Sequence, residues 1–308
     1  MTTGMVSSFM ESAQTVSRQR GVALPGLCLI QDNYYTMTGS ALKGTMRGGA
    51  LPVRLRAELP HGTDMDAARG VLEEAIRVAP VAGLLRTVLK SQFTLTHNGA
   101  VVETGSVPRA LDEPLRFEAS WIDDACPESG DWSALMRRDG PSPTTDEVTS
   151  SPGSSYADQQ SRQLHLRGIC RTRPDGIKSI EQQLFNPHGS IFHLLSEESE
   201  SAGGRGRAPD AASYISAGLA FCFLTQFGRY AKIVKKPLRE YAVAQDTRFP
   251  APGSGAAARP VVTHVYLETG ESDEFARNAL DMAEQTCFLH ALCRTDIGVD
   301  LDVVEAAD

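Results

Sequence analysis

The sequence predicts a mixed fold of helices and strands in which one order of elements occurs twice. The segment Asp210–Lys236 has no charged side chain between Ala211 and Gly228, which indicates a long helix that is buried on all sides. Val53–Leu59 alternates apolar and polar residues, as a half-buried strand does. The order of helices and strands in the first hundred residues recurs from Asp210 onward, which indicates two related modules.

The first module is predicted to contain two helices and three strands. In chain order these are a helix at residues 6–20 that ends at Gly21, a strand at residues 26–39, the strand Val53–Leu59, a helix over Asp64–Leu85 and a strand over Ser91–Leu95. The turn pair Asn98-Gly99 closes the last strand. We assign residues 1–104 to this module, which lacks the strands that open the second one.

The middle of the chain has a different composition. Residues 127–160 include GPSPTTDEVTSSPGSS, a Pro, Ser, Thr and Gly cluster with little to bury, so we predict a linker or mobile segment over residues 105–160. A hairpin at residues 164–185 follows, with its turn at Pro174-Asp175-Gly176. Asp210 then provides a suitable N-cap for the long helix.

The second module, residues 161–308, repeats the order of the first and adds two cysteines. Its later elements are strands over Leu238–Gln245 and Val261–Leu267, a helix over Asp273–Leu292 and a strand over Ile297–Val303. Alignment of the second helices sets Ala79 against Cys287, and alignment of the first helices sets Ser8 near Cys222. The sequence therefore predicts one module with a cysteine pair and one degenerate module without it.

Length and charge limit the class of protein. The chain has 308 residues, enough for two domains, and a net charge of −8, which argues against a nucleic-acid-binding surface. The amino-terminal residues show no basic segment followed by an apolar run, so no secretory signal is expected. Six cysteines without such a signal favour a reducing compartment, the cytoplasm. The small and polar residues of the long helix favour a soluble core helix over a membrane span.

Other motifs for cofactors or metals are weak. Cys287, His290 and Cys293 form a C-x-x-H-x-x-C run, but helical positions six apart do not share a face, so we predict no metal site. The loop SAGGRGRAP lacks the residues of a phosphate-binding or dinucleotide-binding motif, and we predict no cofactor. For Cys222 and Cys287 two interpretations stay open, a redox pair or two small core residues.

Two segments of the second module resemble the motifs of a known family. Residues 216–231, SAGLAFCFLTQFGRYA, form a helix of small residues centred on Cys222, and Ala283-Glu284-Gln285-Thr286-Cys287 is similar to an A-E-x-C-P-V motif. The two cysteines lie 65 residues apart. Together these features resemble the OsmC and organic hydroperoxide resistance family, as a full module in the second half of the chain and a partial one in the first.

The resemblance implies an α+β fold, with two long helices per module packed on antiparallel sheet and the two modules forming a pseudo-dimer. It implies reduction of organic hydroperoxides in which Cys222 attacks, Cys287 resolves and a dithiol reductant restores both thiols. The activating arginine would be Arg171 or Arg173. A further homodimer of the whole chain is left open by the resemblance.

The sequence also differs from the family pattern. Phe288 stands where the family has proline after the second cysteine, and Ala212 stands where its peroxidases have glutamate. These differences favour an alternative from another class, a non-catalytic protein that keeps the fold and binds a small lipophilic ligand.

Overall fold

A computed structural model describes residues 1–85, 88–111, 134–144, 160–250, 254, 256 and 258–306. Its first elements are α1 (Thr2–Arg20), β1 (Cys28–Gly39), β2 (Arg47–Ala50), β3 (Val53–Leu59), α2 (Met65–Val78), the 3-10 helix η1 (Pro80–Leu84), β4 (Gln92–His97) and β5 (Ala100–Val102). The next are β6 (Met136–Pro141), β7 (Gln160–Thr172), β8 (Lys178–Asn186), β9 (Ser190–Ser196) and η3 (Glu200–Ala202). The chain continues with α4 (Ala211–Ile233), β10 (Glu240–Asp246), β11 (Val262–Glu268), α5 (Asp273–Thr286), α6 (Phe288–Cys293) and β12 (Val299–Glu305).

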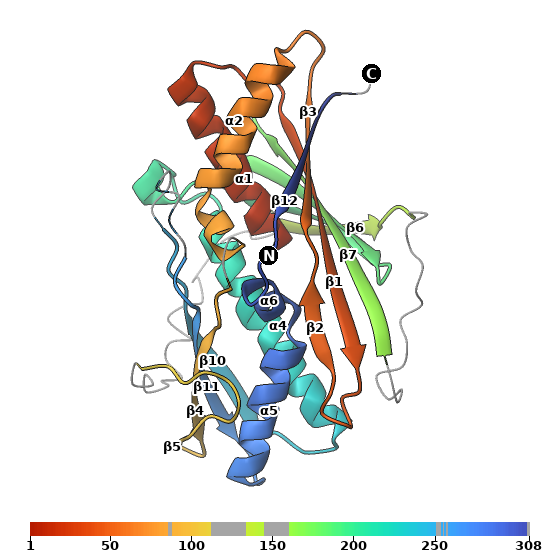
Figure 1. Cartoon of the computed structure of the whole chain (residues 1–308), viewed down its shortest axis with the longest axis vertical. Coiled ribbons are helices and arrows are strands. Elements are labelled where there is room, and N and C mark those ends of the chain that lie inside the picture. The colour runs from red at the N-terminus through yellow and green to blue at the C-terminus, as the bar shows by residue number, and fades with distance from the viewer. Residues whose placement is uncertain are drawn as a thin grey trace.

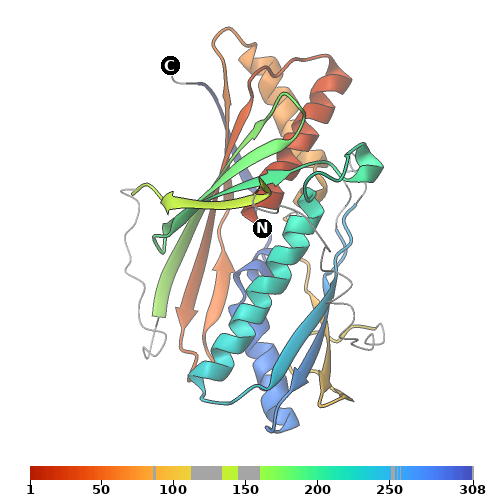
Figure 2. The ribbon, with the colours of Figure 1, turned by 180° about the vertical axis from the view of Figure 1, so that it is seen from behind.

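The fold is α+β, with helices between two sheets. The large sheet has the order β12-β3-β1-β7-β8-β9-β6, with β2 paired to β1, and the small sheet has the order β10-β11-β4-β5. Figures 1 and 2 show α4, α5 and α6 between the small sheet and the large one. This arrangement places the middle of α4 and the end of α5 in the interior of the molecule.

The two halves of the chain exchange strands. β12, from the end of the chain, pairs in parallel with β3, and β4, from the first half, pairs in parallel with β11. The other strand pairs are antiparallel, so the expected antiparallel sheet is correct except at these two exchanges. Each half therefore completes a sheet of the other, as the protomers of an intertwined dimer would.

Two glycines allow α1 and α4 to approach closely. A Cβ on Gly4 would lie 2.7 Å from Cγ1 of Ile215, and a Cβ on Gly218 would lie 2.7 Å from the backbone nitrogen of Met1. Adding 214 to the numbers of the first pair, with its helices exchanged, gives the second. The same relation takes Ser8 to position 222, which is the correspondence predicted from the sequence.

Three features of the structure differ from the sequence predictions. The segment assigned to the linker contains β6, which pairs with β9 at the edge of the large sheet, and most of the rest of that segment lies outside the described residues. α4 is not buried on all sides: an exposed stripe runs along it, and Phe221 is 69% exposed. The helix predicted over Asp273–Leu292 is interrupted at Cys287.

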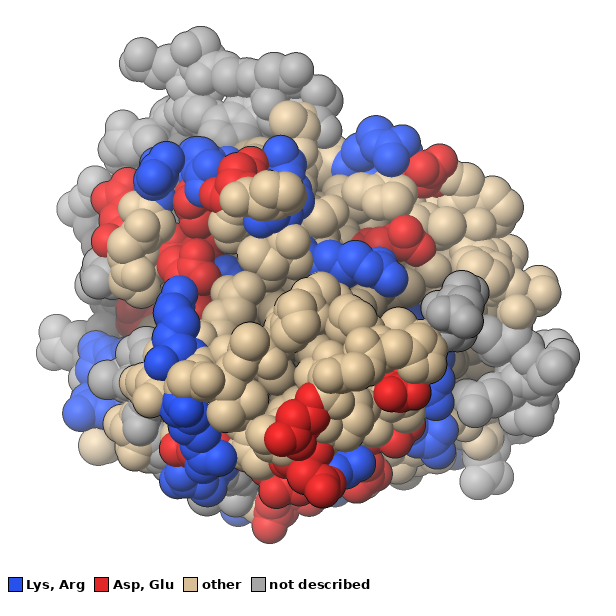
Figure 3. Space-filling view, turned by 90° about the horizontal axis from the view of Figure 1, so that it is seen from above, with Lys and Arg blue, Asp and Glu red and all other residues tan. Residues whose placement is uncertain are grey.

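Acidic and basic side chains are mixed on the face seen from above. Figure 3 shows Lys and Arg side chains interspersed with Asp and Glu on this face, without a large area of one sign. By length and composition α4 could cross a membrane, but within the fold it packs along α1 and α5. This packing is that of a core helix with one face left open.

Candidate active site

Cys222 lies near the middle of α4. The helix begins where Asp210 caps it, with the carboxylate accepting a hydrogen bond from the backbone N–H of Ser213 at 2.7 Å. Phe223 and Phe227 on the same helix are fully buried in the core of the small-sheet side. Cys222 is only partly buried and packs against the edge of that core. The thiol is thus placed between an apolar interior and the open face of the helix.

Cys287 lies at the break between α5 and α6. Its φ of −73° and ψ of 117° are extended values, which end α5 and let a new helix begin at Phe288. The residue is fully buried. Because the first N–H groups of a helix have no partner within it, the N–H groups of Phe288 and Leu289 are free to bind another acceptor.

That acceptor is Cys222. The Cys287 thiol donates a hydrogen bond to Cys222, and the backbone N–H groups of Leu289 and Phe288 donate to it as well. These donors lower the pKa of Cys222 to about 7, against the opposing effect of burial. Burial, together with the neighbouring Cys222, raises the pKa of Cys287 well above its usual value. The pair therefore holds one thiolate and one thiol near neutral pH.

Tyr35 is a third polar group at this site. Its ring lies on β1, with its centroid 5.9 Å from that of Phe288, and the side chain is 2% exposed. Burial, followed by the charges of Cys222, Cys293 and Cys287, raises the pKa of Tyr35. Its hydroxyl has no hydrogen-bond partner within the described part of the chain. A buried donor that faces the thiols is available to an incoming oxygen atom.

His290 contacts the pair from the other side. Its Nδ1 lies 3.2 Å from Sγ of Cys287. The sequence offered His290 only as part of a weak metal motif, and it offered no signal for Tyr35. Both residues reach the site through tertiary contacts, since Tyr35 is on a distant strand and His290 is turned inward by the break at Cys287.

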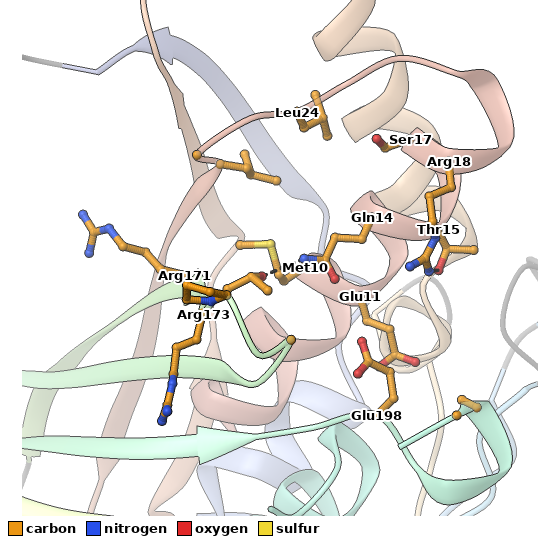
Figure 4. Close-up of a pocket in the computed structure, with 17 residues that line it drawn as sticks. Met10, Glu11, Gln14, Thr15, Ser17, Arg18, Leu24, Arg171, Arg173 and Glu198 are labelled. Carbon is orange, nitrogen blue, oxygen red and sulfur yellow. Dashed lines mark hydrogen bonds between the residues drawn. The ribbon is translucent and has the colours of Figure 1, made fainter. Parts of the chain in front are cut away.

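Arg171 and Arg173 lie elsewhere. Tyr35 pairs with Leu164 on β7, and Arg171 is seven residues further along that strand, about 23 Å away. Figure 4 shows both arginines at a separate cavity of about 960 Å³ beside α1, with their guanidinium groups directed away from Glu11. Arg173 pairs there with Asp175 at 3.0 Å. The structure therefore places neither predicted arginine beside Cys222, because the long strand takes them to the opposite end of the sheet.

The first module has an equivalent position without thiols. Ala79 ends α2 and precedes η1, as Cys287 ends α5 and precedes α6. Ser8 and Pro80 line one cavity of about 160 Å³, together with Phe249 and Pro250. Among the other predicted structural cysteines, Cys28, Cys170 and Cys293 are buried and free, and Cys126 lies outside the described residues.

No protein-family model matches the sequence, and no curated protein matches it. Part of the chain is similar to solved structures of OsmC-type proteins. An OsmC-like protein from Mycoplasma pneumoniae is 14% identical with a TM-score of 0.33, over 45% of this chain and 94% of that one. An organic hydroperoxide resistance protein OsmC from Legionella pneumophila is 19% identical with a TM-score of 0.33, over 44% and 95%.

A third similar structure is a putative organic hydroperoxide resistance protein from Vibrio cholerae, solved with captopril in one of its active sites. It is 23% identical with a TM-score of 0.29, over 40% of this chain and 82% of that one. Each of these likenesses extends over less than half of this chain and most of the other protein.

Proposed function

We propose that this chain is a thiol peroxidase that reduces organic hydroperoxides, with one active site formed by Cys222 and Cys287. The observation behind the proposal is the hydrogen-bonded thiol pair whose two pKa values are shifted in opposite directions. A thiolate is the nucleophile that attacks an O–O bond, and the partner thiol is positioned to resolve the product.

The reaction has three balanced steps. The Cys222 thiolate attacks the outer oxygen of ROOH, the O–O bond breaks, and the alcohol ROH leaves after taking up a proton, which gives the Cys222 sulfenic acid. The Cys287 thiol then displaces that oxygen, so that water leaves and a Cys222–Cys287 disulfide forms. A dithiol reductant restores both thiols by exchange and is itself oxidised to a disulfide.

The surroundings of Cys222 favour an organic peroxide over hydrogen peroxide. Phe223 and Phe227 form an apolar core beside the thiol, and the exposed ring of Phe221 is adjacent to it on α4. An alkyl or aryl group gains free energy when it is transferred from water to such surfaces. The Tyr35 hydroxyl, which has no other partner in the described residues, would donate to the peroxide oxygen.

The proposal is tested by counting free thiols under anaerobic conditions before and after a pulse of cumene hydroperoxide. The expected result is the loss of two thiols per chain in the parent. Cys287→Ser should lose only Cys222, with a sulfenic acid that dimedone traps. If Cys222→Ser consumes the hydroperoxide as fast as the parent, the proposal fails. The reductant and the reducing cytoplasm in which it would act are part of the same proposal.

A second candidate function is binding of a small lipophilic ligand without catalysis. It is favoured by the positions of Arg171 and Arg173, which lie away from Cys222, and by Ala212 at the place of the family's glutamate. Native mass spectrometry of the purified chain separates the two functions. A co-purified apolar ligand combined with thiols that do not react with hydroperoxide would support binding and contradict catalysis.

A further inference from the structure

The hydrogen bonds around Cys287 determine which nitrogen of His290 is protonated. A thiol has one proton. Cys287 donates that proton to Cys222, so its sulfur can only accept from its other neighbour. That neighbour is Nδ1 of His290, at 3.2 Å. His290 must therefore have its hydrogen on Nδ1, and the chain of donors runs from His290 through Cys287 to Cys222.

The surroundings of His290 keep it neutral. The side chain is 1% exposed, and the rings of Phe93 and Phe223 lie with their centroids 5.5 Å from its own. The nearby cation is Arg294, whose guanidinium is engaged by the carboxylate of Glu284 and by backbone carbonyls. Burial, and secondarily Arg294, lowers the pKa of His290 to about 3. A neutral imidazole has a single N–H, and here that N–H is directed at sulfur.

A purely structural role does not account for this histidine. With the hydrogen on Nδ1, the lone pair of Nε2 is buried, and it has no hydrogen-bond partner among the described residues. An unsatisfied buried polar atom lowers stability, and a phenylalanine would fill the same aromatic surroundings without that cost. The contact with Cys287 is the interaction that distinguishes histidine from phenylalanine at this position.

We propose that neutral His290 is the positioning residue of the thiol pair: its Nδ1–H orients the Cys287 thiol toward Cys222 and stabilises negative charge on Cys287 during resolution. The second part rests on the proposed function. In the resolving step the Cys287 S–H bond breaks as the S–S bond forms, the S–O bond of the sulfenic acid breaks, and the proton leaves with the oxygen as water. His290 keeps its own proton throughout, which suits a group that is difficult to protonate.

Two variants separate the hydrogen bond from the shape of the side chain. His290→Asn keeps an N–H donor near the place of Nδ1, and His290→Phe removes the donor and keeps an aromatic ring. In the reduced full-length chain, the pH midpoint of Cys222 alkylation by iodoacetamide is measured with site assignment by mass spectrometry. For His290→Phe we expect a midpoint at least about one pH unit higher, equivalent to roughly tenfold slower alkylation below the midpoint. His290→Asn should stay close to the parent.

The second measurement follows resolution. After a pulse of cumene hydroperoxide, the lifetime of the Cys222 sulfenic acid, trapped with dimedone, should be roughly tenfold longer in His290→Phe than in the parent. An unchanged midpoint and an unchanged lifetime in a folded His290→Phe chain would overturn the inference. So would a His290→Asn chain that matches His290→Phe, because the donor would then not be the cause.

The tautomer can be measured without any variant. Nitrogen-15 chemical shifts of His290 in the reduced parent should show a proton on Nδ1 and none on Nε2, and the reverse tautomer would overturn the inference even if His290→Phe fails to fold. If the alkylation midpoint shifts as expected but no variant, nor the parent, is oxidised by hydroperoxide, the peroxidase proposal fails and the positioning role of His290 stands.

Discussion

Ala79 and Cys287 occupy matching positions at the ends of two helices of equal length. α2 and α5 each have 14 residues, and each ends at one of these two residues in an extended conformation, with ψ of 131° and 117°. A short helical segment follows in both cases, and both side chains are fully buried. The chain therefore builds the same support twice and places a thiol on only one of the two.

The reactivity of Cys222 should change near neutral pH. Its pKa is lowered from 9.0 to about 7, so its thiolate should appear at a lower pH than that of an ordinary cysteine. About a tenth of the thiol should be ionised at pH 6 and about nine-tenths at pH 8. Iodoacetamide labelling with peptide mapping measures this. Cys170, whose pKa is raised to about 12 by burial, is the internal control. A midpoint at or above pH 9 for Cys222 would contradict the geometry described.

Removal of the Tyr35 hydroxyl should slow peroxide reduction without weakening the fold. The hydroxyl is buried and has no partner within the described residues, so Tyr35→Phe removes an unsatisfied group, and stability should hold or rise. If the hydroxyl binds the peroxide oxygen, the second-order rate of Cys222 oxidation should fall by roughly tenfold. Stopped-flow oxidation and thermal melting of the same variant check both parts. An unchanged rate would remove Tyr35 from the reaction.

The crossing of α1 and α4 should not tolerate a larger residue at Gly4. A Cβ there would lie 2.6 Å from the backbone oxygen of Ala211, and neither backbone can move away easily. We expect Gly4→Ala to lower the free energy of unfolding by about 1–3 kcal/mol. Gly270→Ala is the matched control, since nothing lies within 4 Å of its Cβ position. Urea denaturation that ranks the two variants equally would contradict the close approach.

A second thiol pair should be obtainable in the first module. Ser8 lines a cavity with Pro80, the residue after Ala79, as Cys222 contacts Phe288, the residue after Cys287. Ser8→Cys combined with Ala79→Cys should therefore form a disulfide under mild oxidant when Cys222 and Cys287 are replaced by serine. Peptide mapping of the oxidised chain detects it. Two thiols that stay reduced would show that the two positions do not face each other as the second-module pair does.

Residues 161–308 should not form a stable monomer alone. The truncated chain lacks β4, which pairs with β11, and α1, which packs along α4. Apolar surface that these elements cover would be exposed, and we expect aggregation or self-association, measured by light scattering and circular dichroism. Co-expression with residues 1–104 should reduce it. A soluble monomer with native helix content would contradict the exchange of strands.

The sequence was sufficient for the elements whose signal is local. The charge-free run that forms α4, the alternation of Val53–Leu59 and the cap at Asp210 all depend on neighbouring residues, and each is found as expected. The break at Cys287 was not predicted because the apolar pattern continues across it and no proline or glycine marks it. That break creates the free N–H groups at the site.

The partners of Cys222 were beyond a local pattern. Arg171 was chosen because it precedes the helix in a short charged motif, but its place on a 13-residue strand takes it away from the thiol. Tyr35 was missed because nothing near it in the sequence relates it to Cys222. β6 was assigned to a linker because it is short and fully exposed, and only its pairing with β9 orders it.

The parallel pairing of β12 with β3 has a consequence for how the protein is made. Val299 pairs with Val53, so the outer edge of β3 waits for a partner that is synthesised 246 residues later. The half of the molecule that emerges first from the ribosome is thus completed last, by the final strand of the other half. A ribosome that stops early leaves an open strand edge, and the finished protein closes that edge with its own carboxyl-terminal segment.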